Sequence, residues 1–405
     1  MNILKNLKWR NYIDNITKNK NCILNNKLIF YFGFDPTYKS LHIGHLLIFF
    51  LIKEFLYKKK NKIFIILGQF TTKINNFKNH IIIKNLINIK KQIKCFSKKI
   101  LKKKIYILNN NKWLSKINLY KYITNITKNI NLNYLLKKKI INKNFKNINF
   151  NQVLYSTLQA YDYFYLYKKY KCNIQIGGSD QWSNIILGIK LIKKIFKKKV
   201  YGLTYPLLTD NNNIKFSKSN KIFNIWLNKK KNSPFIIYQY FINLSDTKSL
   251  NLLKKCTLIK IKYIKKIIYI YKKNLIFKKV QHILSKIFLI LLYNYNTYMY
   301  SKLFSYYLYK KNNNFLKLKY HLYYIKNNIL YFKINFKKIY NIIFLMKILK
   351  RYLKISLKKI NLYFKNNIIK FNYKIYKIFI KKKIINKYVI GNIGKLFFFI
   401  KIICL

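Results

Sequence analysis

A strand–helix–strand pattern in residues 27–68 constrains the fold of this chain more than any other feature. Residues 27–34 form an almost uninterrupted apolar run, which is typical of a strand buried on both faces. From His42 to about Lys58 the apolar residues recur with a helical period, and residues 61–68 form a second apolar run. A strand, a helix and a strand within about 40 residues predict a parallel βαβ unit.

A second unit of this kind lies between residues 172 and 208. Residues 172–176 predict a strand, and Gly177 and Gly178 follow it. A helix comes next, for which Ser179 or Asp180 is the expected N-cap. Residues 202–208 predict a further strand. Open α/β sheets bind ligands at the carboxyl ends of their strands, so the glycine pair marks a candidate site.

The remaining segments suggest how the chain is divided. Residues 80–150 are rich in Lys and Asn with a mostly helical period, and residues 233–312 have a helical pattern. We therefore expect an α/β domain with a parallel sheet over residues 1–228, with a helical insertion at about 80–150. An α-helical region over 229–344 and a small α+β module over 345–405 are expected to follow.

The charge of the chain is extreme. Its 84 Lys and Arg residues face 7 Asp and Glu residues, a formal net charge of +77. The abundant residues have codons made mostly of A and T, so we attribute the charge mainly to a biased genome. A surface of this kind attracts nucleic acid at low salt, and a site built from many carboxylates is excluded. The few acidic and Gly residues that remain are informative where they cluster.

Cysteine usage favours a reducing compartment. The residues Cys22, Cys95, Cys172, Cys256 and Cys404 are widely spaced and form no CxxC pair. This spacing argues against a disulfide framework and against a structural metal site. No apolar run reaches the roughly 18 residues that a membrane span needs. We expect a cytoplasmic protein that does not bind a membrane.

Two imidazoles define the first candidate site. His42 and His45 stand three residues apart at the predicted start of a helix, with Gly44 between them. Side chains at this spacing lie on one helix face, and a helix N-terminus suits phosphate. A second candidate is the pair Lys215 and Lys218 in a polar loop. By itself a lysine pair carries little weight in such a Lys-rich chain.

The order and spacing of the motifs carry far more information than any one of them. His-Ile-Gly-His follows the first strand, Gly-Gly-Ser-Asp-Gln follows a late strand, and Lys-Phe-Ser-Lys-Ser comes about 35 residues later. This order resembles that of the class I aminoacyl-tRNA synthetases, with their HIGH and KMSKS elements. The flanking residues resemble the bacterial-type tyrosyl-tRNA synthetases. The matching stretches are Gly33–Leu47, Trp113–Asn118, Tyr155–Asp162, Gln175–Asn184, Lys215–Ser219 and Ser233–Asn243.

The resemblance implies a fold and a reaction. The fold would be a Rossmann-like parallel-sheet catalytic domain, an α-helical anticodon-binding region and a degenerate S4-like RNA-binding module, over the three ranges given above. The reaction would activate tyrosine with ATP to tyrosyl-adenylate, with Mg²⁺ accompanying the ATP, and then charge tRNA(Tyr). The family also implies a homodimer.

The resemblance further implies roles for individual residues. The catalytic residues at the phosphates would be His42, His45, Thr37, Lys215 and Lys218. The residues that hold ATP would be Gly33, Asp35, Gly44, Gly177, Gly178, Asp180 and Lys218. The residues that hold tyrosine would be Tyr31, Asp162, Tyr155, Gln159, Gln175 and Asn76. Of these, Asn76 departs from the family, which has an acid at this position for the amino group of the substrate.

Alternative functions remain open from the sequence. A tryptophanyl-tRNA synthetase would have the same fold and chemistry, but Tyr31 and Asp162 favour tyrosine. A non-catalytic RNA-binding paralogue would not need the His and Lys motifs. A nonspecific basic nucleic-acid binder leaves the order of the motifs unexplained.

The tail carries its own pattern. Residues 355–364 predict an amphipathic helix, and residues 366–372 predict a strand and a turn. Residues 391–401 resemble the terminal strand of an S4-like module. Its lysines would bind phosphate rather than read bases.

Overall fold

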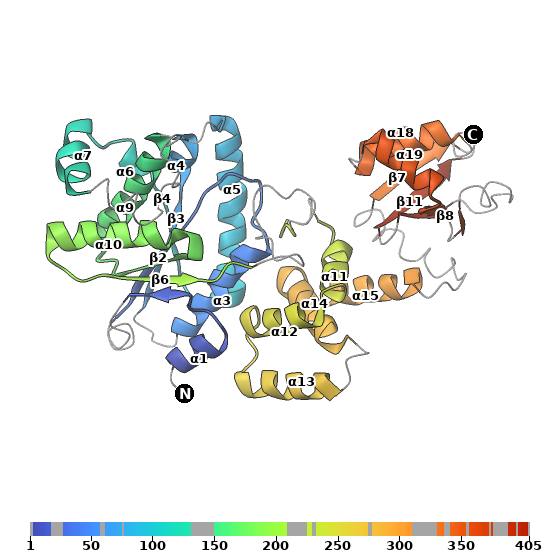
Figure 1. Cartoon of the computed structure of the whole chain (residues 1–405), viewed down its shortest axis with the longest axis horizontal. Helices are drawn as coiled ribbons and strands as arrows, with labels where there is room; N and C mark the ends of the chain where they lie inside the picture. Colours follow the sequence, from blue (N-terminus) through green and yellow to red (C-terminus); the bar gives the residue numbers. More distant parts are fainter. Residues whose placement is uncertain are drawn as a thin grey trace. The chain divides into compact units, whose positions relative to one another are not determined.

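The computed structural model of this chain divides into two compact units (Figure 1). The first contains Met1–Asn228 and Leu244–Val280, and the second contains Lys229–Asn243 and Gln281–Leu405. The described residues are 3–17, 27–56, 61–74, 77–130, 150–208, 225–228, 232–273, 278–309, 330–335, 341–353, 356–371, 374–375, 388–393 and 396–403.

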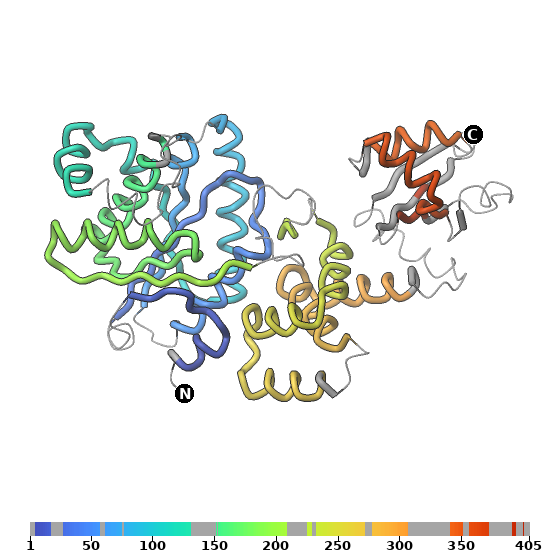
Figure 2. The backbone as a smooth tube through the Cα atoms, in the orientation of Figure 1, coloured from blue at the N-terminus to red at the C-terminus, as the bar shows by residue number. Residues whose placement is uncertain are grey.

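The first unit is built on a six-stranded sheet. Its order is β1-β6-β5-β2-β3-β4. Every neighbouring pair is parallel except β1 with β6, and Figure 2 shows β1 and β6 running side by side. The strands are β1 (Asn15–Ile16), β2 (Ile29–Phe34), β3 (Lys62–Leu67), β4 (Tyr106–Asn109), β5 (Ile174–Gly178) and β6 (Tyr201–Tyr205).

Helices cover both faces of this sheet because side chains alternate along a strand. Phe30 of β2 packs against Phe55 in α3 (Leu46–Phe55), with ring centroids 5.3 Å apart. The next residue, Tyr31, points to the other face and packs against Tyr163 in α9 (Phe150–Tyr170), with ring centroids 5.1 Å apart. Burial on both faces explains why the strands are apolar throughout. The other helices of this unit are α1 (Ile3–Trp9), α4 (Gln69–Ile74), α5 (Asn79–Phe96), α6 (Asn111–Leu114), α7 (Leu119–Asn125), α10 (Trp182–Phe196), α12 (Asp246–Lys255) and α13 (Ile261–Lys273).

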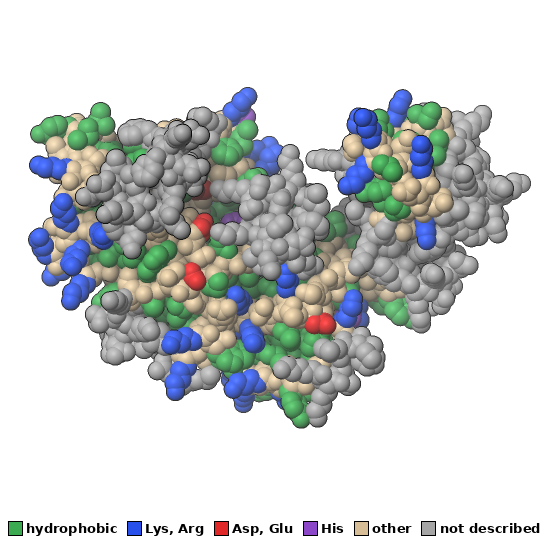
Figure 3. All heavy atoms as spheres, in the orientation of Figure 1, with side chains coloured by type: hydrophobic (Ala, Val, Ile, Leu, Met, Phe, Trp, Pro, Cys, Tyr) green, Lys and Arg blue, Asp and Glu red, His purple; other side chains and the backbone are tan. Residues whose placement is uncertain are grey.

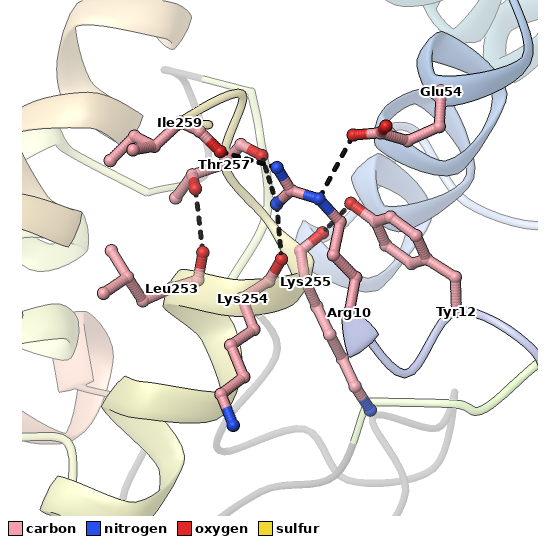
Figure 4. Close-up of polar contacts among 8 residues, drawn as sticks. All are labelled: Arg10, Tyr12, Glu54, Leu253, Lys254, Lys255, Thr257 and Ile259. Atoms are coloured by element: carbon pink, nitrogen blue, oxygen red, sulfur yellow. Dashed lines mark hydrogen bonds and ion pairs between the residues drawn. The ribbon is translucent and has the colours of Figure 1, made fainter. Parts of the chain in front are cut away.

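A buried arginine ties α12 to the N-terminal segment (Figure 4). The Arg10 guanidinium donates to the carbonyls of Lys254, Thr257 and Ile259 at 2.7, 3.2 and 2.6 Å. Its Nε lies 3.1 Å from Glu54 Oε1, on α3. These carbonyls lie at the carboxyl end of α12, where a cation is favourable. The contact therefore joins residues 254–259 to the N-terminal segment and to α3.

Three helices lie wholly or mainly in the second unit. They are α11 (Pro234–Ile242), α14 (Lys279–Leu292) and α15 (Tyr295–Tyr309). Ser233 caps α11 by accepting from the Ile236 N–H, and Pro234 takes the first turn, where its missing N–H costs nothing. Phe235 of α11 packs against Phe304 of α15, with ring centroids 4.9 Å apart.

The C-terminal part holds a separate five-stranded sheet of order β7-β11-β10-β8-β9. Only β7 with β11 is parallel; the other three pairs are antiparallel. Its strands are β7 (Leu330–Asn335), β8 (Ile369–Phe371), β9 (Lys374–Ile375), β10 (Tyr388–Ile393) and β11 (Leu396–Ile403), with helices α18 (Ile342–Leu353) and α19 (Leu357–Lys365).

The fold differs from the sequence-based expectations in several details. Neither Ser179 nor Asp180 caps a helix: both lie in a short 3-10 turn, whose N-cap is Gly178. The stretch 391–401 is not one strand, because it spans the end of β10 and most of β11. The C-terminal sheet also takes β7 from before residue 345. The boundaries predicted after residues 228 and 344 stay predictions.

Basic side chains outnumber acidic ones on the visible surface (Figure 3). Lys and Arg are scattered over the face shown, whereas Asp and Glu are few. Among the described residues, no helix is both long and apolar enough to cross a bilayer.

Candidate active site

A cavity of about 530 Å³ opens at the carboxyl ends of the parallel strands of the first unit. Gly33 and Phe34 at the end of β2, Gly177 and Gly178 at the end of β5, and Tyr205 at the end of β6 all line it. Parallel strands direct their carboxyl ends to one edge, so residues far apart in sequence meet here.

The cavity brings together every predicted site residue that the structure describes. These residues are Tyr31, Gly33, Asp35, Thr37, His42, Gly44, His45, Tyr155, Gln159, Asp162, Gln175, Gly177, Gly178 and Asp180. The predicted residues Asn76, Lys215 and Lys218 lie outside the described residues.

Asp162 is a buried carboxyl group held by two donors. Trp113 Nε1 donates to its Oδ1 at 2.8 Å, and Asn110 Nδ2 donates to its Oδ2 at 3.2 Å. Burial raises the pKa of Asp162 to about 7, against the lowering effect of these two hydrogen bonds. The Trp113 ring stacks on Tyr165, with centroids 4.6 Å apart, which fixes the direction of its N–H.

Two buried polar atoms in the cavity have no hydrogen-bond partner within the described part of the chain. They are the Tyr31 hydroxyl and Gln175 Oε1, on residues that pair across β2 and β5. Their side chains are only 2% and 3% exposed. Burial, followed by the Asp162 charge, raises the pKa of Tyr31 well above its usual value. An unsatisfied buried polar atom is costly, so these two atoms point to a polar ligand.

Asp35 follows β2 directly and is held from two helices. Tyr155 in α9 donates its hydroxyl to Asp35 Oδ2 at 2.9 Å, and Thr71 in α4 donates to Oδ1 at 3.2 Å. The Asp35 charge is the largest cause that raises the pKa of Tyr155. Glycine is required at residue 68, because a Cβ there would lie 2.2 Å from Asp35 Oδ1.

The two imidazoles of the His-Ile-Gly-His sequence lie against each other, with ring centroids 3.7 Å apart and ring planes tilted by 36°. His42 Nδ1 accepts from the Gly44 N–H at 3.2 Å, and His45 Nδ1 accepts from the His42 N–H at 3.1 Å. In both rings, Nδ1 therefore accepts a hydrogen bond from a backbone N–H. A Cβ at Gly44 would lie 3.0 Å from the His42 ring, so glycine allows this arrangement.

A short segment after the predicted lysine loop reaches the same histidines. Ile43 N donates to Ile225 O at 3.0 Å, and Leu227 N donates to Leu41 O at 2.9 Å. The Trp226 ring lies edge-on to His42, with centroids 6.2 Å apart. Residues 225–227 therefore lie beside the histidines.

Sequence reasoning missed several residues that shape this site. Asn110 and Trp113 hold Asp162, and Thr71 holds Asp35. Trp113 stood within a stretch that matched the family, which was the available signal. Nothing in the local sequence around Asn110 indicates its contact with Asp162, 52 residues later.

The arrangement can bind a polar ligand in the cavity. It has a buried polar end at Asp162 and Tyr31. It also has the paired imidazoles of His42 and His45, and glycines at the ends of β2 and β5. Within the described residues, no group of three or more His, Cys, Asp or Glu side chains could hold a metal ion. The mostly parallel sheet and its cavity fit the class I tRNA synthetase fold.

The comparisons agree with this class and narrow it. Residues 24–289 match the family described as tRNA synthetases class I (W and Y), and the chain belongs to this family. A solved structure with a similar fold is a C-terminally truncated mitochondrial tyrosyl-tRNA synthetase from Aspergillus nidulans. It has a TM-score of 0.66 at 23% identity, over 76% of this chain and 94% of that one.

Curated relatives are more similar in sequence. The tyrosine–tRNA ligase of Wigglesworthia glossinidia brevipalpis is 35% identical over 283 residues, which cover 65% of this chain and 66% of that protein. The tyrosine–tRNA ligase of Blochmanniella floridana is 36% identical over 272 residues, or 62% of this chain and 64% of that protein. The match thus spans just under two thirds of the length of these relatives.

Proposed function

We propose that this protein is a tyrosine–tRNA ligase. It activates tyrosine with ATP to tyrosyl-adenylate and pyrophosphate, and then transfers tyrosine to the 3′ end of tRNA(Tyr). The observation that carries the proposal is the buried polar end of the cavity, where Asp162 lies near the unpartnered Tyr31 hydroxyl. The family match and the names of the curated relatives support the same function.

Amino-acid choice follows from this polar end. A substrate phenol gives a donor to Asp162 and a partner to Tyr31. Phenylalanine would leave the Tyr31 hydroxyl without a partner and would offer no donor to Asp162, and a buried polar pair of this kind rejects a ligand that lacks the matching hydroxyl. Tyrosyl-tRNA synthetase is itself the standard example of this effect. The same polar pair favours tyrosine over tryptophan, the other substrate of the family.

Activation needs positioning and charge stabilisation rather than a general base. The tyrosine carboxylate is already a nucleophile and attacks the α-phosphate of ATP, while pyrophosphate leaves. His42, His45 and Thr37 contact the phosphates, and Lys215 and Lys218 stabilise the leaving pyrophosphate. The Mg²⁺ that accompanies ATP is held mainly by phosphate oxygens.

The nucleotide lies near the carboxyl ends of β2 and β5. Its adenosine part packs against Gly44, Gly178 and Asp180. A Cβ at Gly178 would lie 2.6 Å from the side chains of Asp180 and Leu207, so glycine keeps this wall open.

Outside the catalytic domain, the roles are also proposals. Residues 229–344 would bind the anticodon region, and the C-terminal sheet would be an S4-like module that binds the RNA backbone. A homodimer follows from the family resemblance.

Charging of tRNA(Tyr) with labelled tyrosine by the purified chain tests the proposal. We expect tyrosyl-tRNA to form only with ATP present, and absence of charging would contradict the proposal.

Lys218→Ala tests the role proposed for the lysine loop. It should slow adenylate formation and leave tyrosine affinity unchanged, because a group that acts on the transition state changes kcat.

A further inference from the structure

The segment 36–41 connects β2 to the His-Ile-Gly-His sequence and forms part of the cavity wall. Thr37, Tyr38, Ser40 and Leu41 all line the cavity. The segment lies outside any helix or strand, so no ladder of backbone hydrogen bonds fixes its position. Its buried polar groups therefore need partners from elsewhere in the chain.

Two amide side chains of α5 hold the two ends of this segment. Asn85 Nδ2 donates to Pro36 O at 2.9 Å. Gln92 Oε1 accepts from the Leu41 N–H at 2.8 Å, and Gln92 Nε2 donates to Ser40 Oγ at 3.1 Å. The two amides stand about two helical turns apart, so they lie on the same face of α5. Both support the cavity wall from behind, since neither lines the cavity itself.

Leu41 connects this support to the segment 225–227. Its carbonyl accepts from Ser40 Oγ at 2.8 Å and from the Leu227 N–H at 2.9 Å. Gln92 therefore binds the N–H of the residue whose carbonyl holds Leu227. This residue directly precedes His42, the first imidazole of the site.

We infer that Gln92 is a positioning residue for the activation step. It fixes the Leu41 backbone, and through Leu41 it sets the start of the His-Ile-Gly-His sequence and the place of residues 225–227. The inference rests on the proposed function, in which the histidines contact the phosphates of ATP. A displacement of about 1 Å caused by a change far from the reacting atoms can lower a rate by about a hundredfold. Gln92 acts only through this backbone, and no bond is made or broken at its side chain.

Single-turnover adenylate formation by the full chain, measured together with equilibrium binding of tyrosine, tests the inference. Gln92→Met keeps the length of the side chain and removes both hydrogen bonds. We expect the rate at saturating ATP and tyrosine to fall by at least about tenfold. The Kd of tyrosine should change by less than about twofold, because Asp162 is held by Trp113 and Asn110 and not by α5.

A matched variant controls for the substitution itself. Lys91→Met places the same side chain at the neighbouring position of α5, which is exposed. We expect its rate of adenylate formation and its tyrosine affinity to stay within about twofold of wild type.

Hydrogen exchange at single amides gives a second readout that does not depend on activity. The Leu41 N–H loses its acceptor in Gln92→Met, and the Leu227 N–H depends on the carbonyl of the same residue. Both amides should exchange at least about tenfold faster than in wild type. In Lys91→Met they should exchange as in wild type.

Three results would overturn the inference and leave the proposed function intact. They are an unchanged rate of adenylate formation in Gln92→Met, a loss of tyrosine affinity as large as the loss of rate, and unchanged exchange at Leu41 and Leu227. A wild-type chain that forms no adenylate is a distinct result. It would contradict the proposed function, and the inference would fall with it.

Discussion

Asp162 shows how one buried residue can be prepared for a ligand. Its carboxyl group is only 5% exposed, and burial opposes its charge while Trp113 and Asn110 support it. A carboxylate buried with too few donors would bind a proton instead. The two donors occupy one oxygen each, and each oxygen keeps a further lone pair that can accept a hydrogen bond.

Trp113 allows this preparation to be tested. Trp113→Phe keeps a ring that can stack on Tyr165 and removes the N–H that Asp162 Oδ1 accepts. We expect the ratio of kcat/KM for tyrosine to that for phenylalanine to fall by about tenfold, since a hydrogen bond to a charged group contributes roughly 1.5–3 kcal/mol. Trp9→Phe, outside the cavity, is the matched control. An unchanged ratio in Trp113→Phe would contradict the role given to this donor.

The raised pKa of Asp162 also predicts a pH dependence of stability. The usual pKa is 3.8, and that of the folded protein is about 7. Between these values the folded state holds a proton that the unfolded state has lost, so stability falls as pH rises from about 4 to about 7. Relative to Asp162→Asn, wild type should lose about 2–4 kcal/mol of unfolding free energy over this range. Urea unfolding of both proteins at pH 4.5, 6 and 8 measures the difference, which would stay constant if Asp162 titrated normally.

At the scale of elements, α3 and α12 meet at the buried Arg10. A guanidinium reaches three carbonyls and Glu54 at once because its donors form a planar fork, and an ammonium cannot. The Tyr12 hydroxyl adds a bond to Lys255 O at 2.5 Å. The chain has few Arg and few acidic residues, and this contact uses one of each, Arg10 and Glu54.

Arg10→Lys should therefore destabilise the first unit although the charge is kept. We expect a loss of about 2–4 kcal/mol in unfolding free energy, since the contact is buried and its acceptors would be left unpaired. The thermal unfolding midpoint and urea unfolding would show it. Lys8→Arg, an exposed change on α1, is the control. Equal stability of the two variants would mean that the fork geometry does not matter.

The elements also show what sequence patterns can predict. The apolar runs 27–34 and 61–68 correspond to β2 and β3, since a strand buried on both faces has a strong local pattern. β4 was not predicted, because Tyr106–Asn109 is short and lies in a Lys- and Asn-rich stretch. The helix after Gly178 was expected, but its cap was not, because a short 3-10 turn at Ser179–Gln181 comes before the helix.

The site itself could be predicted as far as its motifs extend. Order and spacing brought the His, Gly and Asp residues together correctly. The hydrogen bonds of Asn110 and Trp113 to Asp162 depend on packing between segments about 50 residues apart, and no local pattern carries that information.

At the scale of the whole molecule, removal of the C-terminal sheet tests whether adenylate formation and tRNA charging depend on different parts of the chain. Because β7 pairs with β11, a cut at residue 345 would leave one strand of the sheet behind. Truncation after residue 329 removes all five strands together. We expect adenylate formation to persist, while tRNA charging falls by at least about tenfold at moderate salt as phosphate contacts are lost. Equal charging by the truncated and full chains would contradict an RNA-binding role for this sheet.

Amino-acid-dependent exchange of pyrophosphate into ATP tests the central claim most directly, because it requires the cavity, its polar end and the phosphate-binding residues to work together. With the purified full chain and Mg²⁺, we expect exchange with tyrosine and far weaker exchange with phenylalanine or tryptophan. Asp162→Ala should abolish most of the exchange and its selectivity. Equal exchange with tyrosine and phenylalanine, or stronger exchange with tryptophan, would contradict the account of a tyrosine-specific ligase.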